Sequence, residues 1–252
     1  MASSQTSGAP APRPGVVLAA RVVYGAVALA VAVGLVVQIT LIFSGGTDAN
    51  SGASGTAVPL ATRLVRLFSF FTIQSNLVVC VVAALMAMDP RRDGRGWRVA
   101  QLDALLGIII TGVVYDIMLA PLLHLTGWAE VATILLHYVS PWLAVIAWVL
   151  FGPRRRLGIR TAAAAFIWPV VWLVYTFAHG AVTNWYPYPF LDAGHLGLAQ
   201  ALVNAVMVLV AAVVLAVVVM IADRFVPALL SPRVGSTPQP ASADPTGPVA
   251  AP

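Results

Sequence analysis

The sequence predicts an all-α fold, a six-helix polytopic integral membrane bundle with both chain ends in the cytoplasm. Its composition, the length of its apolar runs and the placement of its arginines predict this fold. Of the 252 residues, 60% are hydrophobic and only 9% are charged, whereas about 25% of the residues of a soluble domain are charged. Because so little polar surface cannot cover a water-exposed globule, the lipid bilayer is the expected solvent.

Six apolar runs each have the length of about 20 residues that a helix needs to cross the hydrocarbon core. Since backbone polar groups in lipid must be satisfied within the segment, each run is predicted to be an α-helix. The runs cover about 22–43, 67–88, 99–123, 129–151, 161–182 and 196–222. They form one predicted transmembrane domain, 16–230, between two tails, 1–15 and 231–252, whose Pro, Ser and Gly content predicts disorder.

Arginine supplies all 14 basic residues, because the chain has no lysine. Twelve of them lie near the chain ends or in the loops 89–98 and 152–160, and the other two are Arg63 and Arg66 in the loop 44–66. The positive-inside rule therefore predicts a multi-pass cell-membrane protein with both termini inside. The arginines are spread along the chain rather than gathered on one face, so nucleic acid is not an expected partner. The oligomeric state is left open.

Polar side chains of several runs are predicted to lie at one depth, roughly 5–14 Å below the outer surface, from the helical rise of about 1.5 Å per residue. An ionisable group in hydrocarbon is costly unless it is paired or wetted. A shared polar cavity is the favoured interpretation, and hydrogen bonds that hold helices together are the alternative. The cytoplasmic halves of the helices are expected to carry almost no chemistry. The members of the band are Thr72, Ser75, Asn76, Asp116, His137, Tyr175, His179 and Asn204, with Gln38 and Gln200 at a similar height.

A hydroxyl and an imidazole in this band suit nucleophilic catalysis. Thr72 is the candidate nucleophile and His137 the candidate general base, since a neutral imidazole accepts a hydroxyl proton. Asp116 is placed to orient His137, and Asn76 or Tyr175 to stabilise an oxyanion. Spacing alone does not separate this arrangement from polar contacts between helices.

No cofactor or metal is expected, because no His or Cys pair has the spacing of a metal motif. A metal site of His137, His179 and Asp116, or a haem between the two histidines, stays open as a lesser alternative. The only cysteine, Cys80, excludes an intrachain disulfide and is interpreted as a small buried hydrophobe. The aromatic segment 183–195 is predicted to be an interfacial belt, with a lid over the cavity as the alternative.

Three short motifs carry a family resemblance: FSFFTIQSNLVV at 68–79, ILLHYVSPWL at 134–143 and WYPYPFLD at 185–192. They resemble the androgen-induced and androgen-dependent membrane hydrolase family, whose bacterial relatives are called Pr-six-Pr membrane proteins. The likeness covers the second to the fifth apolar run.

The resemblance implies an intramembrane hydrolase of fatty-acid esters of hydroxy fatty acids. It implies Thr72 as nucleophile and His137 as the catalytic histidine, and His179 in TFAHG matches a second family histidine. The leading hypothesis is therefore a lipid-ester hydrolase, with membrane lipids and an acyl ester from the outer leaflet as partners. A non-catalytic lipid-binding or small-molecule-binding or transport protein, and a purely structural protein whose polar band joins helices, are the alternatives.

Overall fold

Six helical segments of the protein are long and apolar enough to cross a membrane, which confirms the predicted fold class. A computed structural model describes residues 14–230, and it contains helices and loops and no strand over that range. The chain is therefore an integral membrane protein of the multi-pass class. The predicted tails lie outside the described residues except for Pro14 and Gly15, which already belong to the first helix because proline is well suited to a first helical position.

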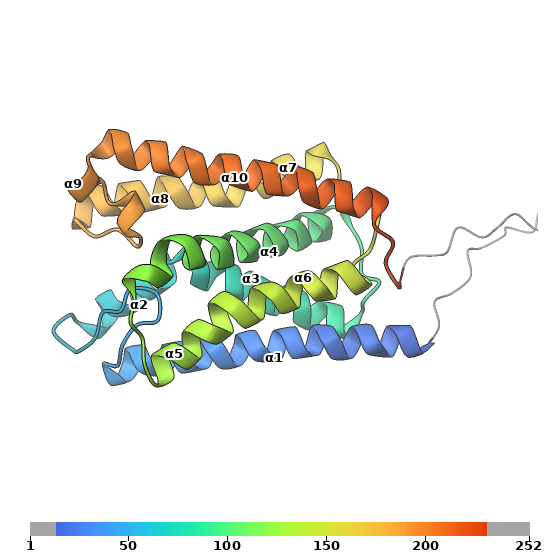
Figure 1. Ribbon diagram of the computed structural model, residues 1–252, viewed down its shortest axis with the longest axis horizontal. Helices are drawn as coiled ribbons and strands as arrows, with labels where there is room; N and C mark the ends of the chain where they lie inside the picture. Colours follow the sequence, from blue (N-terminus) through green and yellow to red (C-terminus); the bar gives the residue numbers. More distant parts are fainter. Residues whose placement is uncertain (1–13, 231–252) are drawn as a thin grey trace, which may run out of the picture.

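Most helices are joined by short connections, and a longer loop joins α1 to α2 (Figure 1). Two segments, η1 and η3, are π-helical, and η2 and η4 are short 3-10 turns. In chain order they are α1 Pro14–Ser44, α2 Leu60–Ser69, α3 Phe71–Met88, α4 Arg95–Val114, η1 Tyr115–Leu119, η2 Ala120–Leu122, α5 Trp128–Thr133, η3 Ile134–Val139, α6 Ser140–Phe151, α7 Ile159–Ala165, α8 Ile167–Thr183, η4 Pro189–Leu191, α9 Ala193–Leu196 and α10 Leu198–Phe225.

Helices α1, α3, α4 and α6 pack into the main body of the bundle, and α8 and α10 run alongside it (Figure 1). Val31 of α1, Ile73 of α3, Ile108 of α4 and Leu136 of η3 are fully buried in one apolar cluster. Gly34 lets α1 approach η3, because an added Cβ would lie 2.8 Å from a methyl of Leu136. This small-residue contact is typical of packing between membrane helices.

The second predicted run, 67–88, is two helices rather than one. Phe70 is extended, with φ −68° and ψ 128°, and it separates α2 from α3. The prediction was wrong here because the local sequence has neither glycine nor proline to mark a break. As a result Thr72 lies in the first turn of α3, where backbone N–H groups have no partner within the helix.

Two prolines accompany the irregular helical turns of the bundle. Pro121 lies in η2 directly after the π-helical turn η1, and Pro141 follows η3. Proline has no amide hydrogen, so Pro141 leaves the carbonyl of His137 without its usual helical donor. Widened π turns inside α-helices are frequent at functional sites, and these two carry Tyr115 and His137.

Candidate functional site

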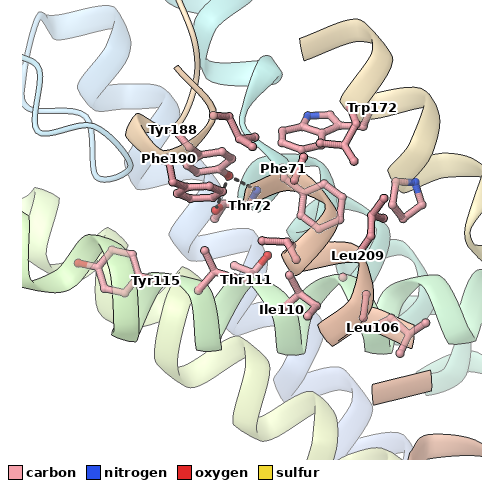
Figure 2. A pocket seen from close by; sticks show the side chains of 18 of the residues that line it. Phe71, Thr72, Leu106, Ile110, Thr111, Tyr115, Trp172, Tyr188, Phe190 and Leu209 are labelled. Carbon is pink, nitrogen blue, oxygen red and sulfur yellow. Dashed lines mark hydrogen bonds between the residues drawn. The ribbon is translucent and has the colours of Figure 1, made fainter. Parts of the chain in front are cut away.

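A narrow apolar groove separates α3 and α4 from the pair α8 and α10 (Figure 2). Its volume is about 70 Å³. Along α4 it extends from Asp103 to Tyr115, a rise of about 18 Å, which is more than half of the roughly 30 Å hydrocarbon core. Leu106, Ile110 and Leu209 belong to its largely hydrocarbon wall. The groove is long and apolar enough to lie along an acyl chain, and its volume of about 70 Å³ takes up part of such a chain.

Thr72 lies in the wall of this groove, and its side chain is buried. Its Oγ1 lies 3.2 Å from the phenol oxygen of Tyr188, and its backbone N–H donates to the same oxygen over 3.1 Å (Figure 2). Tyr188 therefore places an oxygen atom at the N-terminal turn of α3. Exposed N–H groups at such a turn are suited to hold an oxygen that carries negative charge.

Tyr188 is neutral in this position. It precedes η4 in the loop between α8 and α10, and its burial raises the pKa of the phenol to about 12. Phe190 and Leu191 of the same loop line the groove beside it. The aromatic segment thus covers one end of the groove, which is the contact expected of the lid alternative rather than of an interfacial belt alone.

His137 is fully buried in η3, and neither ring nitrogen has a hydrogen-bond partner among the described residues. Its ring stacks on that of Tyr115, with the centroids 3.9 Å apart. Tyr115 lines the groove, whereas His137 lines a second pocket of about 210 Å³ on another side of α4. No hydrogen bond joins Thr72 to His137 in the described structure.

Asn76 connects the backbones on which Thr72 and His137 lie. Its Nδ2 donates to the carbonyl of Thr72 over 2.9 Å and to the carbonyl of Leu136 over 3.2 Å. Its Oδ1 accepts from the hydroxyl of Ser140 over 2.7 Å. This fully bonded amide holds α3 against η3, which is the interhelical role that the alternative interpretation gave to the band.

Two further predicted residues, Asp116 of η1 and Ser75 of α3, lie apart from the groove. Asp116 is exposed in the His137 pocket and accepts from the hydroxyl of Tyr138 over 3.1 Å, so it does not orient His137. Ser75 is buried near Gly107, and its hydroxyl has no partner among the described residues.

The predicted polar residues of α8 and α10 also point elsewhere. The hydroxyl of Tyr175 lies 2.6 Å from that of Ser69, and its ring stacks on His179 at 5.4 Å. Asn204 donates to the carbonyl of Phe190 over 2.8 Å. The single shared cavity is therefore not formed, and the histidine pair needed for a metal or a haem is not brought together. The prediction failed because the helical rise gives the depth of a residue in the membrane but not the direction in which its side chain points from the helix axis.

Within residues 14–230 no group of three or more His, Cys, Asp or Glu residues is arranged to hold a metal ion.

The loop between α1 and α2 holds a buried polar cluster that the sequence did not reveal. Gln38 of α1 accepts from the N–H of Ala49 over 3.1 Å, and Thr133 donates to the carbonyl of Ala49 over 3.2 Å. Asp48 is buried here, and this burial raises the pKa of its carboxyl although hydrogen bonds from Asn50 oppose the shift. The cluster fastens the loop to α1 and α5.

Sequence reasoning also missed Tyr188, Tyr115 and Asp103. The two tyrosines reach Thr72 and His137 only through the packing of distant segments, and nothing local predicts this. Asp103 did leave a signal, because it is an acid inside the apolar run 99–123. The expectation that the cytoplasmic halves carry almost no chemistry stays a prediction.

Fold and site together define a multi-pass membrane protein with an intramembrane apolar groove. Comparison with protein-family models, with curated proteins and with solved structures finds no match for this chain.

Proposed function

We propose that this protein is an intramembrane hydrolase of lipid acyl esters that uses Thr72 as its nucleophile. The observation that carries the proposal is the position of the Thr72 hydroxyl, which lies in the wall of a groove shaped for an acyl chain and in the first turn of α3. The resemblance to the androgen-induced membrane hydrolase family supports the same residue. The acyl chain would lie along α4, with its ester group beside Thr72.

The first chemical step joins the Thr72 oxygen to the ester carbonyl carbon. The carbonyl oxygen takes the place of the Tyr188 phenol and accepts from the N–H of Thr72, which stabilises the oxyanion. His137 takes the hydroxyl proton and returns it to the departing alcohol. Water then cleaves the acyl-threonine and releases the acid. In this proposal substrate entry moves Tyr115 away from His137, whose ring nitrogens lack partners in the present arrangement.

A fluorophosphonate probe tests the nucleophile directly. The purified protein should be labelled, Thr72→Ala should abolish labelling, and Thr72→Ser should retain it because the hydroxyl remains. Thr111→Ala is the matched control, since Thr111 carries another buried hydroxyl in the same groove. Labelling of Thr72→Ala at the wild-type level would exclude the assignment.

A second candidate function is lipid binding without covalent chemistry. It is favoured by the absence of a Thr72–His137 hydrogen bond and by the existing bond between Thr72 and Tyr188. It predicts that lipids raise the unfolding temperature of wild type and of Thr72→Ala equally, while wild type turns over no acyl ester. Turnover that depends on Thr72 would exclude it.

A further inference from the structure

The groove carries an acidic side chain at the end opposite Thr72. Asp103 lies eight residues after the start of α4 at Arg95, a rise of about 12 Å into the helix. It lines the groove, and no hydrogen bond or ion pair of the described residues involves its carboxylate. Both ion pairs at this end of the bundle are made by Asp93, with Arg98 and Arg156.

The protein supplies no positive charge to Asp103 within the groove. From α7 and α8, the residues Ala165, Phe166 and Pro169 line this region, and α10 contributes Ala212. The only other titratable groups in the groove wall are the phenols of Tyr115 and Tyr188, near its other end. A carboxylate in a membrane segment without a partner is a functional feature by default, because its burial is costly.

A backbone carbonyl of the groove wall also lacks its usual helical donor. Helix α7 ends at Ala165, and the chain resumes as α8 at Ile167. Pro169 has no amide hydrogen, so the carbonyl of Ala165 lacks its usual donor four residues further on. Leu105 of α4 and Ala165 belong to one buried apolar cluster, which keeps α4 and α7 in contact at this level.

We propose that the Asp103 end of the groove binds the ammonium group of a long-chain amine whose alkyl chain occupies the groove. An ammonium group has three donors and no acceptor, which complements the unpaired carboxylate of Asp103. Its charge compensates that of Asp103 in a medium where an unpaired charge is unfavourable. Phe166 also belongs to the groove wall, and the face of an aromatic ring attracts a cation.

This site shares the groove with the proposed hydrolase but rests on Asp103, not on the reactivity of Thr72. An amine bound there is an amphiphile held at its head group, whether or not an ester is cleaved at the other end. Failure of either proposal therefore leaves the other standing.

The test compares dodecylamine with dodecanol on the full chain in a non-ionic detergent. Dodecylamine should raise the unfolding temperature of wild type clearly more than dodecanol does, and Asp103→Asn should remove this difference. The amine should bind that variant about tenfold more weakly, which corresponds to about 1.4 kcal/mol. Asp116→Asn is the matched control, since that carboxylate lies outside the groove, and Thr72→Ala should keep the preference for the amine.

Two outcomes overturn the proposal. One is equal stabilisation of wild type by the amine and by the alcohol, which would mean that a proton alone neutralises Asp103. This comparison needs no variant, so it decides the question even where Asp103→Asn does not fold. The other is an unchanged preference for the amine in Asp103→Asn.

Discussion

At the scale of single residues, the polar side chains inside this bundle fall into two groups. Asn76 uses both ends of its amide in hydrogen bonds, and such a saturated group holds helices together. His137 and Thr111 are buried without a partner among the described residues. Buried polar atoms are nearly always bonded, so each exception calls for an explanation. Of these two, Thr111 lines the groove and His137 lines the second pocket, so each offers an unpaired polar group to a ligand there.

Tyr188 gives a prediction on pH. Its pKa is raised from 10.0 to about 12 in the folded protein, so folding favours the neutral phenol. The contribution of this phenol to the free energy of unfolding should be fully present below pH 10 and be lost as the pH rises from 10 to 12. The reason is that the phenol of the unfolded chain releases its proton at a lower pH than that of the folded protein. Chemical unfolding in detergent at several pH values measures this loss.

Tyr188→Phe is the comparison that isolates this group from the other tyrosines. The variant should be less stable by about 1 kcal/mol at pH 8, because the hydrogen bond to Thr72 is lost. Between pH 10 and 12 the free energy of unfolding of this variant should fall by less than that of wild type. Parallel pH curves for the two proteins would contradict the prediction.

At the scale of elements, the sequence determines which segments enter the membrane but not how they are rotated. Run length and apolar content predict all six spans, and the helical rise places Thr72 and His137 in the outer half. Rotation depends on packing, and packing turned Tyr175 and His179 away from the groove. The break at Phe70 and the loop residue Tyr188 were not predicted, because their cause is a contact between segments more than 100 residues apart.

The aromatic loop after α8 depends on one glycine. A Cβ added at Gly180 would overlap the ring of Tyr186, so Gly180→Ala must displace the loop that carries Tyr188. We expect the variant to lose about 1–3 kcal/mol of stability, the usual cost of overpacking. In the proposed hydrolase it should also change the rate of fluorophosphonate labelling, since Tyr188 contacts Thr72. Thermal unfolding and labelling kinetics measure the two effects.

Gly96→Ala is the control for that substitution. Gly96 lies in the first turn of α4 with open space around its Cα, so alanine should leave stability unchanged or raise it slightly. An equal response of the two variants would show that the loop does not depend on close contact with α8.

At the scale of the whole molecule, the two ends of the bundle differ in charge. One end carries the first residues of α1, the loops after α3 and α6, and the end of α10 (Figure 1). There Asp223 of α10 accepts from the backbone N–H groups of Arg156 and Leu157, and Arg98 pairs with Asp93. This pairing lowers the pKa of the Asp93 carboxyl. The opposite end carries the aromatic loop and the Thr72 end of the groove.

The distribution of arginine predicts that the Asp93 end faces the cytoplasm, and cysteine labelling tests this orientation. Cys80→Ser gives a background without thiols, into which one cysteine is placed at Ser54 or at Gly96, both exposed at opposite ends of the bundle. In intact cells an impermeant maleimide should label the Ser54→Cys protein only. The Gly96→Cys protein should react only after the cells are opened, and the background should never react. The reverse pattern would turn the Thr72 end of the groove toward the cytoplasmic leaflet, so an ester from the outer leaflet would meet Asp103 first.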